Sequence, residues 1–214
     1  MEDAQATRLD AQKSSLRAAE QARADVAQAR RAWRELQPRL NPRKLVFLDE
    51  TWAKTNMTRL YGRSPRGRRL VAAAPFGQWN TSTLIAALQH DGIVAPMVLD
   101  GALNGRAFLA WVRHFLAPTL RAGDFVVADK LASHKVAGVR DAIGASGASL
   151  LFLPAYSPDL NPIEQAFAKV KAWLRRAEPR TRDELWRTVG SALEGFAPDE
   201  CRNHLRHCGY AHPQ

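Results

Sequence analysis

Several features are scarce or missing in this 214-residue chain, and each absence removes a class of protein. It has only two cysteines, Cys201 and Cys208, which are too few for a disulfide framework and favour a reducing compartment. No apolar run approaches the roughly 20 residues that a membrane-spanning helix needs. The first residues, Met1-Glu2-Asp3-Ala4, lack the basic and apolar segments of a secretory signal. We therefore expect a cytoplasmic protein with no membrane partner.

Acidic residues are missing from the whole segment between Thr51 and His90, although it carries six basic residues. The net charge of the chain is +10. Charge alone would also suit a solvated basic surface, but such clustering favours a polyanionic partner, which we expect to be DNA. A second basic cluster lies between positions 169 and 182. From these clusters the candidate DNA-binding residues are Lys54, Arg63, Arg66, Arg68, Arg69, Lys171 and Arg175.

Glycine is absent from the first 37 residues, as is proline, while Ala, Arg and Gln are abundant. Large apolar residues are few there, so the segment predicts an exposed helix or linker rather than a folded domain. The sequence from Pro38 to Pro42 should end that helix. We expect residues 1–42 to form a helical linker or extension, and residues 43–214 to form one globular domain.

The remainder of the chain alternates short apolar runs with segments of helical periodicity. Three antiparallel strands are followed by helix, strand, helix, strand and helices, which is an α/β order with a mixed five-stranded central sheet flanked by helices. The expected strands are 45–48, 81–89, 94–99, 125–128 and 149–153. One expected helix begins at Asn104-Gly105, and the others cover 136–145, 162–177, 182–196 and 199–207.

Two carboxylates come directly after predicted buried strands. Asp49 follows the run Leu45–Leu48, and Asp129 follows Phe125–Ala128. A carboxylate there is costly unless it lies at the exposed end of the strand or binds a cation. Each Asp could instead begin a turn and accept a backbone hydrogen bond. For each Asp alone, these two interpretations stay open.

A third carboxylate, Glu164, allows two interpretations. Asn161 and Pro162 suit the start of a helix, and Glu164 could close a capping box with Asn161. On that helix Glu164 also lies on one stripe with Lys171 and Arg175, beside the expected core. Such a stripe could place a metal ligand at one end and phosphate-binding cations along the rest.

Three carboxylates on two strands and a helix can hold a pair of divalent ions. Hard oxygen ligands select Mg²⁺, with Mn²⁺ as a substitute, over zinc. Such a pair activates water or a DNA 3′-hydroxyl for attack on a phosphodiester. Glu50 is the main rival to Asp49, but side chains alternate along a strand, so it should point to the opposite face.

Three motifs resemble the transposases of the insertion sequence 630 family, within the mariner superfamily. The motifs are Phe47-Leu48-Asp49-Glu50-Thr51-Trp52, Asp129-Lys130-Leu131-Ala132-Ser133-His134-Lys135 and Leu153–Glu164. The interval between Asp129 and Glu164 is 164 − 129 − 1 = 34 residues, which is the spacing of that family. The resemblance covers the chain from about Arg43 to Tyr210.

The resemblance implies a ribonuclease H-like catalytic domain in which Asp49, Asp129 and Glu164 are the catalytic metal ligands. It implies excision of a DNA element at its ends and strand transfer into a TA target. His134 and Lys135, in the second motif, become candidates for DNA contacts near the active site, although His134 could equally be a histidine at a helix N-terminus with no such role. The expected partners are DNA and either a second copy of the chain or a separate N-terminal DNA-binding polypeptide.

The chain departs from the family in two places. The residue after the second Asp is usually Asn, but here it is Lys130, whose ammonium would repel Mg²⁺ if it points inward. No helix-turn-helix motif is evident in residues 1–42. The functions that remain open are an active transposase domain, a catalytically weakened DNA-binding remnant and a host nuclease of the same fold, which the long third motif disfavours.

Aromatic and sulfur-containing residues receive simpler interpretations. We expect Trp52, Trp79 and Trp111 to lie in the core rather than to stack on bases. The C-terminal segment Cys201–Cys208 contains two cysteines and two histidines, but their packing into one helical segment fits a tetrahedral zinc site poorly.

Overall fold

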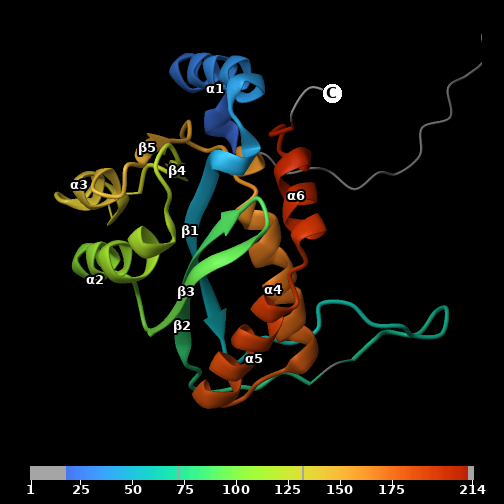
Figure 1. Cartoon of the computed structure of the whole chain (residues 1–214). Coiled ribbons are helices and arrows are strands. Elements are labelled where there is room, and N and C mark those ends of the chain that lie inside the picture. The colour runs from blue at the N-terminus through green and yellow to red at the C-terminus, as the bar shows by residue number, and fades with distance from the viewer. Residues whose placement is uncertain (1–17, 72, 132, 212–214) are drawn as a thin grey trace, which may run out of the picture.

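The computed structural model describes residues 18–71, 73–131 and 133–211. Figure 1 shows a central sheet between two groups of helices. The strands are β1 (Leu45–Lys54), β2 (Thr81–Gln89), β3 (Gly92–Asp100), β4 (Phe125–Ala128) and β5 (Ser149–Phe152). The α-helices are α1 (Ala24–Leu36), α2 (Gly105–Trp111), α3 (Val139–Gly144), α4 (Ile163–Ala177), α5 (Arg182–Glu194) and α6 (Pro198–His207).

The five strands form one mixed sheet in the order β3-β2-β1-β4-β5. β1 pairs antiparallel with β2, and β2 with β3, while β4 runs parallel to β1 and β5 parallel to β4. β1 pairs with β4 only from Leu45 to Phe47, whereas its pairing with β2 continues to Lys54. The carboxyl end of β1 therefore has an open side, next to the end of β4. This is where ligand sites collect in open α/β sheets.

Alternating side chains of β1 belong to two separate hydrophobic cores, one on each face of the sheet. Leu45 and Phe47 join the core beneath α4, α5 and α6, whereas Val46 and Leu48 join the core beneath α2 and α3. All four are nearly or fully buried, which explains why this strand reads as a continuous apolar run. The fold is the predicted ribonuclease H-like arrangement, with helices on both faces of the sheet (Figure 1).

The element bounds differ from the prediction mainly at β1 and α3. The strand expected over 45–48 continues to Lys54, so Asp49 lies within β1 and not after its end. We expected a helix over 136–145, but the α-helix covers only Val139–Gly144. It begins after Gly138, whose φ of +88° lies in the left-handed region and so cannot continue a right-handed helix toward the N-terminus. In contrast, Asn104 begins α2 as expected, since its side chain accepts a hydrogen bond from the backbone N–H of Ala107.

Helix α1 packs against the body of the protein, so the prediction of an exposed helix or linker is wrong for this part of the chain. Val26, Arg30 and Trp33 are buried, and Trp33 joins the core that contains Phe47. The thin apolar stripe was misleading because part of the buried face is polar. The expectation for residues 1–17, including the missing helix-turn-helix, lies outside the described residues.

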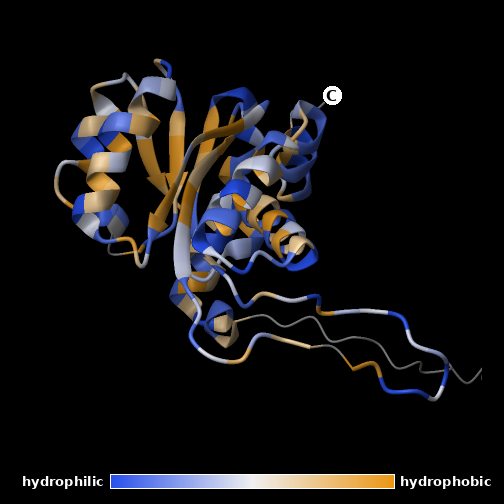
Figure 2. Ribbon diagram, turned by 90° about the horizontal axis from the view of Figure 1, so that it is seen from below, coloured by the Kyte–Doolittle hydropathy of each residue, from blue (hydrophilic) through white to orange (hydrophobic). Residues whose placement is uncertain are grey.

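The connection between β1 and β2 is a long loop, residues 55–80, that projects from the body (Figures 1 and 2). At its base the N–H of Thr55 donates to the carbonyl of Asn80 at 3.2 Å, and the Arg180 guanidinium donates to the carbonyls of Thr55 and Met57.

No helix in the described part of the chain is long and apolar enough to cross a membrane.

Candidate active site

The three predicted carboxylates line one cavity of about 440 Å³. Asp49 reaches it from β1, Asp129 from the end of β4, and Glu164 from the first turn of α4. Asn161 and Lys130 also line the cavity. Residues more than 100 positions apart in the sequence thus meet where the sheet opens between β1 and β4.

Asp49 is a buried carboxylate held by two hydrogen bonds. The backbone N–H of Glu50 donates to Oδ1 at 2.8 Å, and the side-chain amide of Asn161 donates to Oδ2 at 2.8 Å. Burial, reinforced by the negative charges of Glu164 and Asp129, raises the pKa of Asp49 to about 8. A cation between the three carboxyl groups would favour their ionised forms and so oppose this rise in the pKa of Asp49.

The capping interpretation of Glu164 is not supported. Asn161 directs its side-chain amide to Asp49, and no side chain caps the N-terminus of α4 in the structure. Burial raises the pKa of Glu164 and Asp129 adds to the effect, while the Lys171 ammonium, two turns further along α4, opposes it. The predicted stripe of Glu164 and Lys171 therefore does place a carboxylate and a cation within electrostatic reach of each other.

His134 connects the second motif to the first. Its Nδ1 lies 2.7 Å from Oδ1 of Asp129, and its Nε2 lies 2.8 Å from Oε2 of Glu50. The side chain is only 1% exposed, so the structure contradicts the expectation that His134 contacts DNA. Burial alone would lower the pKa of His134, but the two carboxylate partners outweigh it and raise the pKa to about 9.

Glu50 faces away from Asp49, as the strand alternation predicted. It bonds His134, whose ring packs against Phe108 of α2 at 4.6 Å between ring centroids. Asp49 instead bonds Asn161, which precedes α4 on the other side of the sheet. Glu50 therefore supports the site from behind through His134.

A half-exposed aromatic side chain lies on β1, three residues beyond Asp49. Trp52 is 46% exposed, and its ring is flanked by the ammonium groups of Lys54 and Lys171, which lie 4.9 Å and 4.4 Å from the ring centroid. The expectation that Trp52 and Trp79 are core residues is wrong, since Trp79 is also 51% exposed. Trp111 is fully buried, as predicted.

Four of the predicted arginines lie on the projecting loop, whereas Arg175 lies on α4. Arg66 stands at its tip, in a turn where the N–H of Arg68 donates to the carbonyl of Pro65 at 3.0 Å and Gly67 adopts a φ of +81°. Arg63, Arg66, Arg68 and Arg69 are all exposed, as is Lys135. All five are accessible to a polyanion, but the loop that carries the four arginines projects away from the body (Figure 2).

The donor set fits a hard divalent ion, although its members are not arranged as a finished site. Among the described residues, no group of three or more His, Cys, Asp or Glu side chains is positioned to hold an ion, and this includes the C-terminal Cys201–Cys208 segment. Asn161 Oδ1 is buried, and no described residue bonds it. This free oxygen beside three carboxylates is the ligand chemistry that Mg²⁺ or Mn²⁺ prefers.

Residues 44–186 match the family model described as "DDE superfamily endonuclease". The chain belongs to this DDE endonuclease family. No curated protein matches it. The matched range of the DDE endonuclease contains all three carboxylates, Asn161 and the projecting loop, and it ends within α5.

Solved structures similar to this DDE endonuclease include those of the Mos1 mariner transposase. A Mos1 paired-end complex with the left transposon end has a TM-score of 0.73 at 16% identity, covering 93% of this chain and 63% of that chain. The Mos1 catalytic domain alone has a TM-score of 0.61 at 15% identity, covering 86% of each. These identities show a shared fold, and the chain spans less than two thirds of the longer protein.

Two residues of the site were not found from the sequence. Asn161 was interpreted only as a helix cap, although its place in the third motif was a usable signal. Arg30 carried no signal at all, yet it is buried and bonds Ser157 and Asp159 of the segment that lines the cavity.

Proposed function

We propose that this chain is the catalytic part of a cut-and-paste DNA transposase of the insertion sequence 630 family. It would cleave phosphodiester bonds at the ends of a DNA element and join the freed 3′-hydroxyl to target DNA. The observation that carries the proposal is the meeting of Asp49, Asp129 and Glu164 on one cavity beside a basic surface. Their order and spacing in the chain match the family motifs.

In this proposal Asp49, Asp129 and Glu164 hold Mg²⁺, or Mn²⁺ in its place. Bound divalent ions would activate the attacking oxygen and stabilise the leaving oxygen of the phosphodiester. Asn161 holds Asp49 in orientation, and His134 does the same for Asp129. Asn161 donates to Oδ2 of Asp49 and His134 lies against Oδ1 of Asp129, and each carboxylate would keep further lone pairs for the ion.

DNA would lie along the exposed side of β1 and α4. Lys171 supplies a cation within electrostatic reach of Glu164 and Asp49, and Trp52 presents an aromatic face between Lys171 and Lys54. Arg175 adds a second cation on α4 near Lys171. The exposed arginines of the projecting loop would add phosphate contacts farther from the cavity. We further propose that the chain acts in the cytoplasm, either as a homodimer or with a separate DNA-binding polypeptide.

The direct test is nicking of a supercoiled plasmid by the full chain in Mg²⁺ and in Mn²⁺. We expect nicking that EDTA stops and that Asp49→Asn, Asp129→Asn and Glu164→Gln each reduce by at least about 100-fold. Asp141→Asn removes an exposed carboxylate on α3 and serves as the control. Equal nicking by all four variants would contradict the assignment of the site.

A DNA-binding remnant is the second candidate, because Lys130 lines the cavity and would repel the metal. In that case the protein binds the plasmid, with an affinity that falls steeply as salt rises, but does not nick it at any metal concentration.

A further inference from the structure

The segment between β5 and α4 forms one wall of the cavity and is not part of the sheet. Residues 154–162 include Ala155, Tyr156, Ser157, Pro158 and Asn161, all of which line the cavity. Only one short 3-10 turn, Pro158–Leu160, gives this segment regular structure. Something else must hold it in the conformation that brings Asn161 to Asp49.

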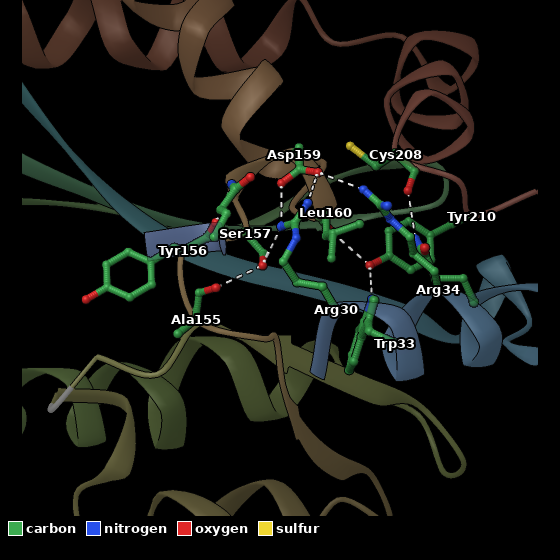
Figure 3. Close-up of polar contacts among 12 residues, drawn as sticks. Arg30, Trp33, Arg34, Ala155, Tyr156, Ser157, Asp159, Leu160, Cys208 and Tyr210 are labelled. Carbon is green, nitrogen blue, oxygen red and sulfur yellow. Dashed lines mark hydrogen bonds and ion pairs between the residues drawn. The ribbon is translucent and has the colours of Figure 1, made fainter. Parts of the chain in front are cut away.

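Helix α1 supplies most of the polar contacts to this segment (Figure 3). The guanidinium of Arg30 donates to Ser157 Oγ at 2.7 Å and to the two carboxylate oxygens of Asp159 at 2.9 Å and 2.7 Å. Ser157 Oγ in turn donates to the carbonyl of Ala155 at 3.0 Å. A single buried arginine thus contacts two positions of the cavity wall.

A second chain of contacts fixes the end of the segment nearest Asn161. The indole N–H of Trp33 donates to the hydroxyl of Tyr210 at 2.8 Å, and that hydroxyl donates to the carbonyl of Leu160 at 2.8 Å. Leu160 directly precedes Asn161 in the chain. Both contact chains therefore run from α1 to residues within four positions of the Asp49 partner.

We propose that Arg30 is a positioning residue for catalysis, which holds the 154–162 segment so that Asn161 orients Asp49 and Glu164 begins α4 beside the cavity. The catalytic part of this inference rests on the proposed function, whereas the role of Arg30 in holding the 154–162 segment does not. Arg30 touches no carboxylate of the triad, and a bidentate guanidinium is suited to fix a loop because its fork is planar and rigid. Removing it leaves Asp159 with only the longer 3.6 Å contact to Arg34, and leaves Ser157 with only its bond to the Ala155 carbonyl.

The first measurement is hydrogen exchange in the full chain, comparing Arg30→Gln with Arg31→Gln. Arg31 is the neighbouring residue on the same helix and is exposed, so this control removes the same charge without touching the segment. We expect amide exchange in peptides spanning 154–163 to rise by about 10-fold in Arg30→Gln and to stay unchanged in Arg31→Gln. Peptides of β2 should exchange at the wild-type rate in both.

The second measurement separates positioning from mere stability. Arg30→Gln should lower the plasmid nicking rate by about 10-fold and raise the Mn²⁺ concentration for half-maximal nicking, while the Kd for DNA changes by less than 2-fold. Arg30→Lys retains the charge but not the fork, so it should recover the fold and DNA binding and only part of the nicking rate.

Wild-type exchange in 154–163 of Arg30→Gln would overturn the inference, as would a loss of DNA affinity equal to the loss of nicking. If Arg30→Gln unfolds, Asp159→Asn removes the same ion pair from the other side, and unchanged local exchange there overturns the inference. A wild-type chain that never nicks refutes the proposed function, whereas the exchange experiment still tests the role of Arg30 in the segment.

Discussion

Asn161 donates its side-chain amide to Oδ2 of Asp49 at 2.8 Å, and this bond joins the third motif to the first across 112 residues of sequence. A cap on α4 would need Asn161 Oδ1 to accept a backbone N–H, but no described residue bonds that oxygen, so Asn161 contacts Asp49 and does not cap the helix. It also turns Asp49 so that one oxygen is held by the backbone N–H of Glu50 and the other by Asn161. The orientation of the buried carboxylate thus depends on a residue that is not itself acidic.

The first prediction concerns this bond. Asn161→Ala removes a hydrogen bond to a buried carboxylate, a loss that corresponds to about 1.5–3 kcal/mol. We therefore expect nicking to fall by roughly 10- to 100-fold while the protein stays folded. Asn203→Ala, an exposed change on α6, is the control. Circular dichroism checks the fold, and wild-type nicking by a folded Asn161→Ala protein would show that Asp49 needs no such partner.

The second prediction is that Asp49→Asn stabilises the metal-free protein. Burial and the charges of Glu164 and Asp129 raise the pKa of Asp49 to about 8, so the folded state disfavours its ionised form. Below about pH 4 the carboxyl is protonated in both folded and unfolded states, and it contributes no penalty. As pH rises toward 8 the unfolded state ionises freely while the folded state resists, so stability falls.

Asn carries no charge at any of these pH values, so its advantage should grow between pH 5 and pH 8. Near pH 8 we expect a gain on the order of 2 kcal/mol, or roughly 4–8 °C in Tm for a chain of this size. Thermal unfolding in EDTA at several pH values measures this. Added Mg²⁺ should raise the Tm of the wild type but not of Asp49→Asn. A constant Tm difference across this pH range would contradict the prediction.

The third prediction tests the projecting loop. If Arg66 and Arg68 each contact a phosphate, the double variant Arg66→Gln/Arg68→Gln should reduce the slope of log K against log salt by about 1.8. The control is Arg39→Gln/Arg121→Gln, which removes two exposed charges near the amino ends of β1 and β4, opposite the cavity. Titration of labelled duplex DNA at several salt concentrations gives both slopes. Equal slopes would place the DNA away from the loop.

The strands and the three carboxylates could be predicted from the sequence because the relevant signals are local. A run such as Val46–Leu48 is apolar because helices cover both faces of its strand, and the Asp that follows marks where the pairing of β1 with β4 has ended, although β1 itself continues to Lys54. The contribution of α1 could not be predicted in this way. Its buried face contains Arg30, and the residue that follows the helix, Gln37, is buried as well. A buried polar residue can be recognised only when its partner, such as Asp159 or the Cys208 carbonyl, is known.

The same limit explains the errors at His134 and Trp52. His134 lies in a polar motif, and only the fold reveals that Asp129 and Glu50 enclose it. Trp52 sits in a strand whose neighbours are buried, so the core was the natural expectation. Because β4 ends before it reaches this part of β1, one side of β1 is left open and Trp52 stays half exposed.

The last prediction concerns Lys130, which is exposed and lines the cavity directly after Asp129. At about 5 Å and an effective dielectric near 20, a unit charge repels a divalent ion by on the order of 6 kcal/mol. Water and the flexible side chain reduce this greatly, since an exposed ammonium can swing away from the ion. We therefore expect Lys130→Asn to lower the Mg²⁺ concentration for half-maximal nicking by about 3- to 10-fold, with little change at saturating Mg²⁺.

Lys135→Asn removes the same charge from the exposed turn that follows and should leave this concentration unchanged. Nicking measured across a Mg²⁺ titration separates the outcomes. Identical metal dependence in the wild type and Lys130→Asn would show that the ammonium stays outside the field of the ion, and the departure from the family motif would then be neutral for metal binding.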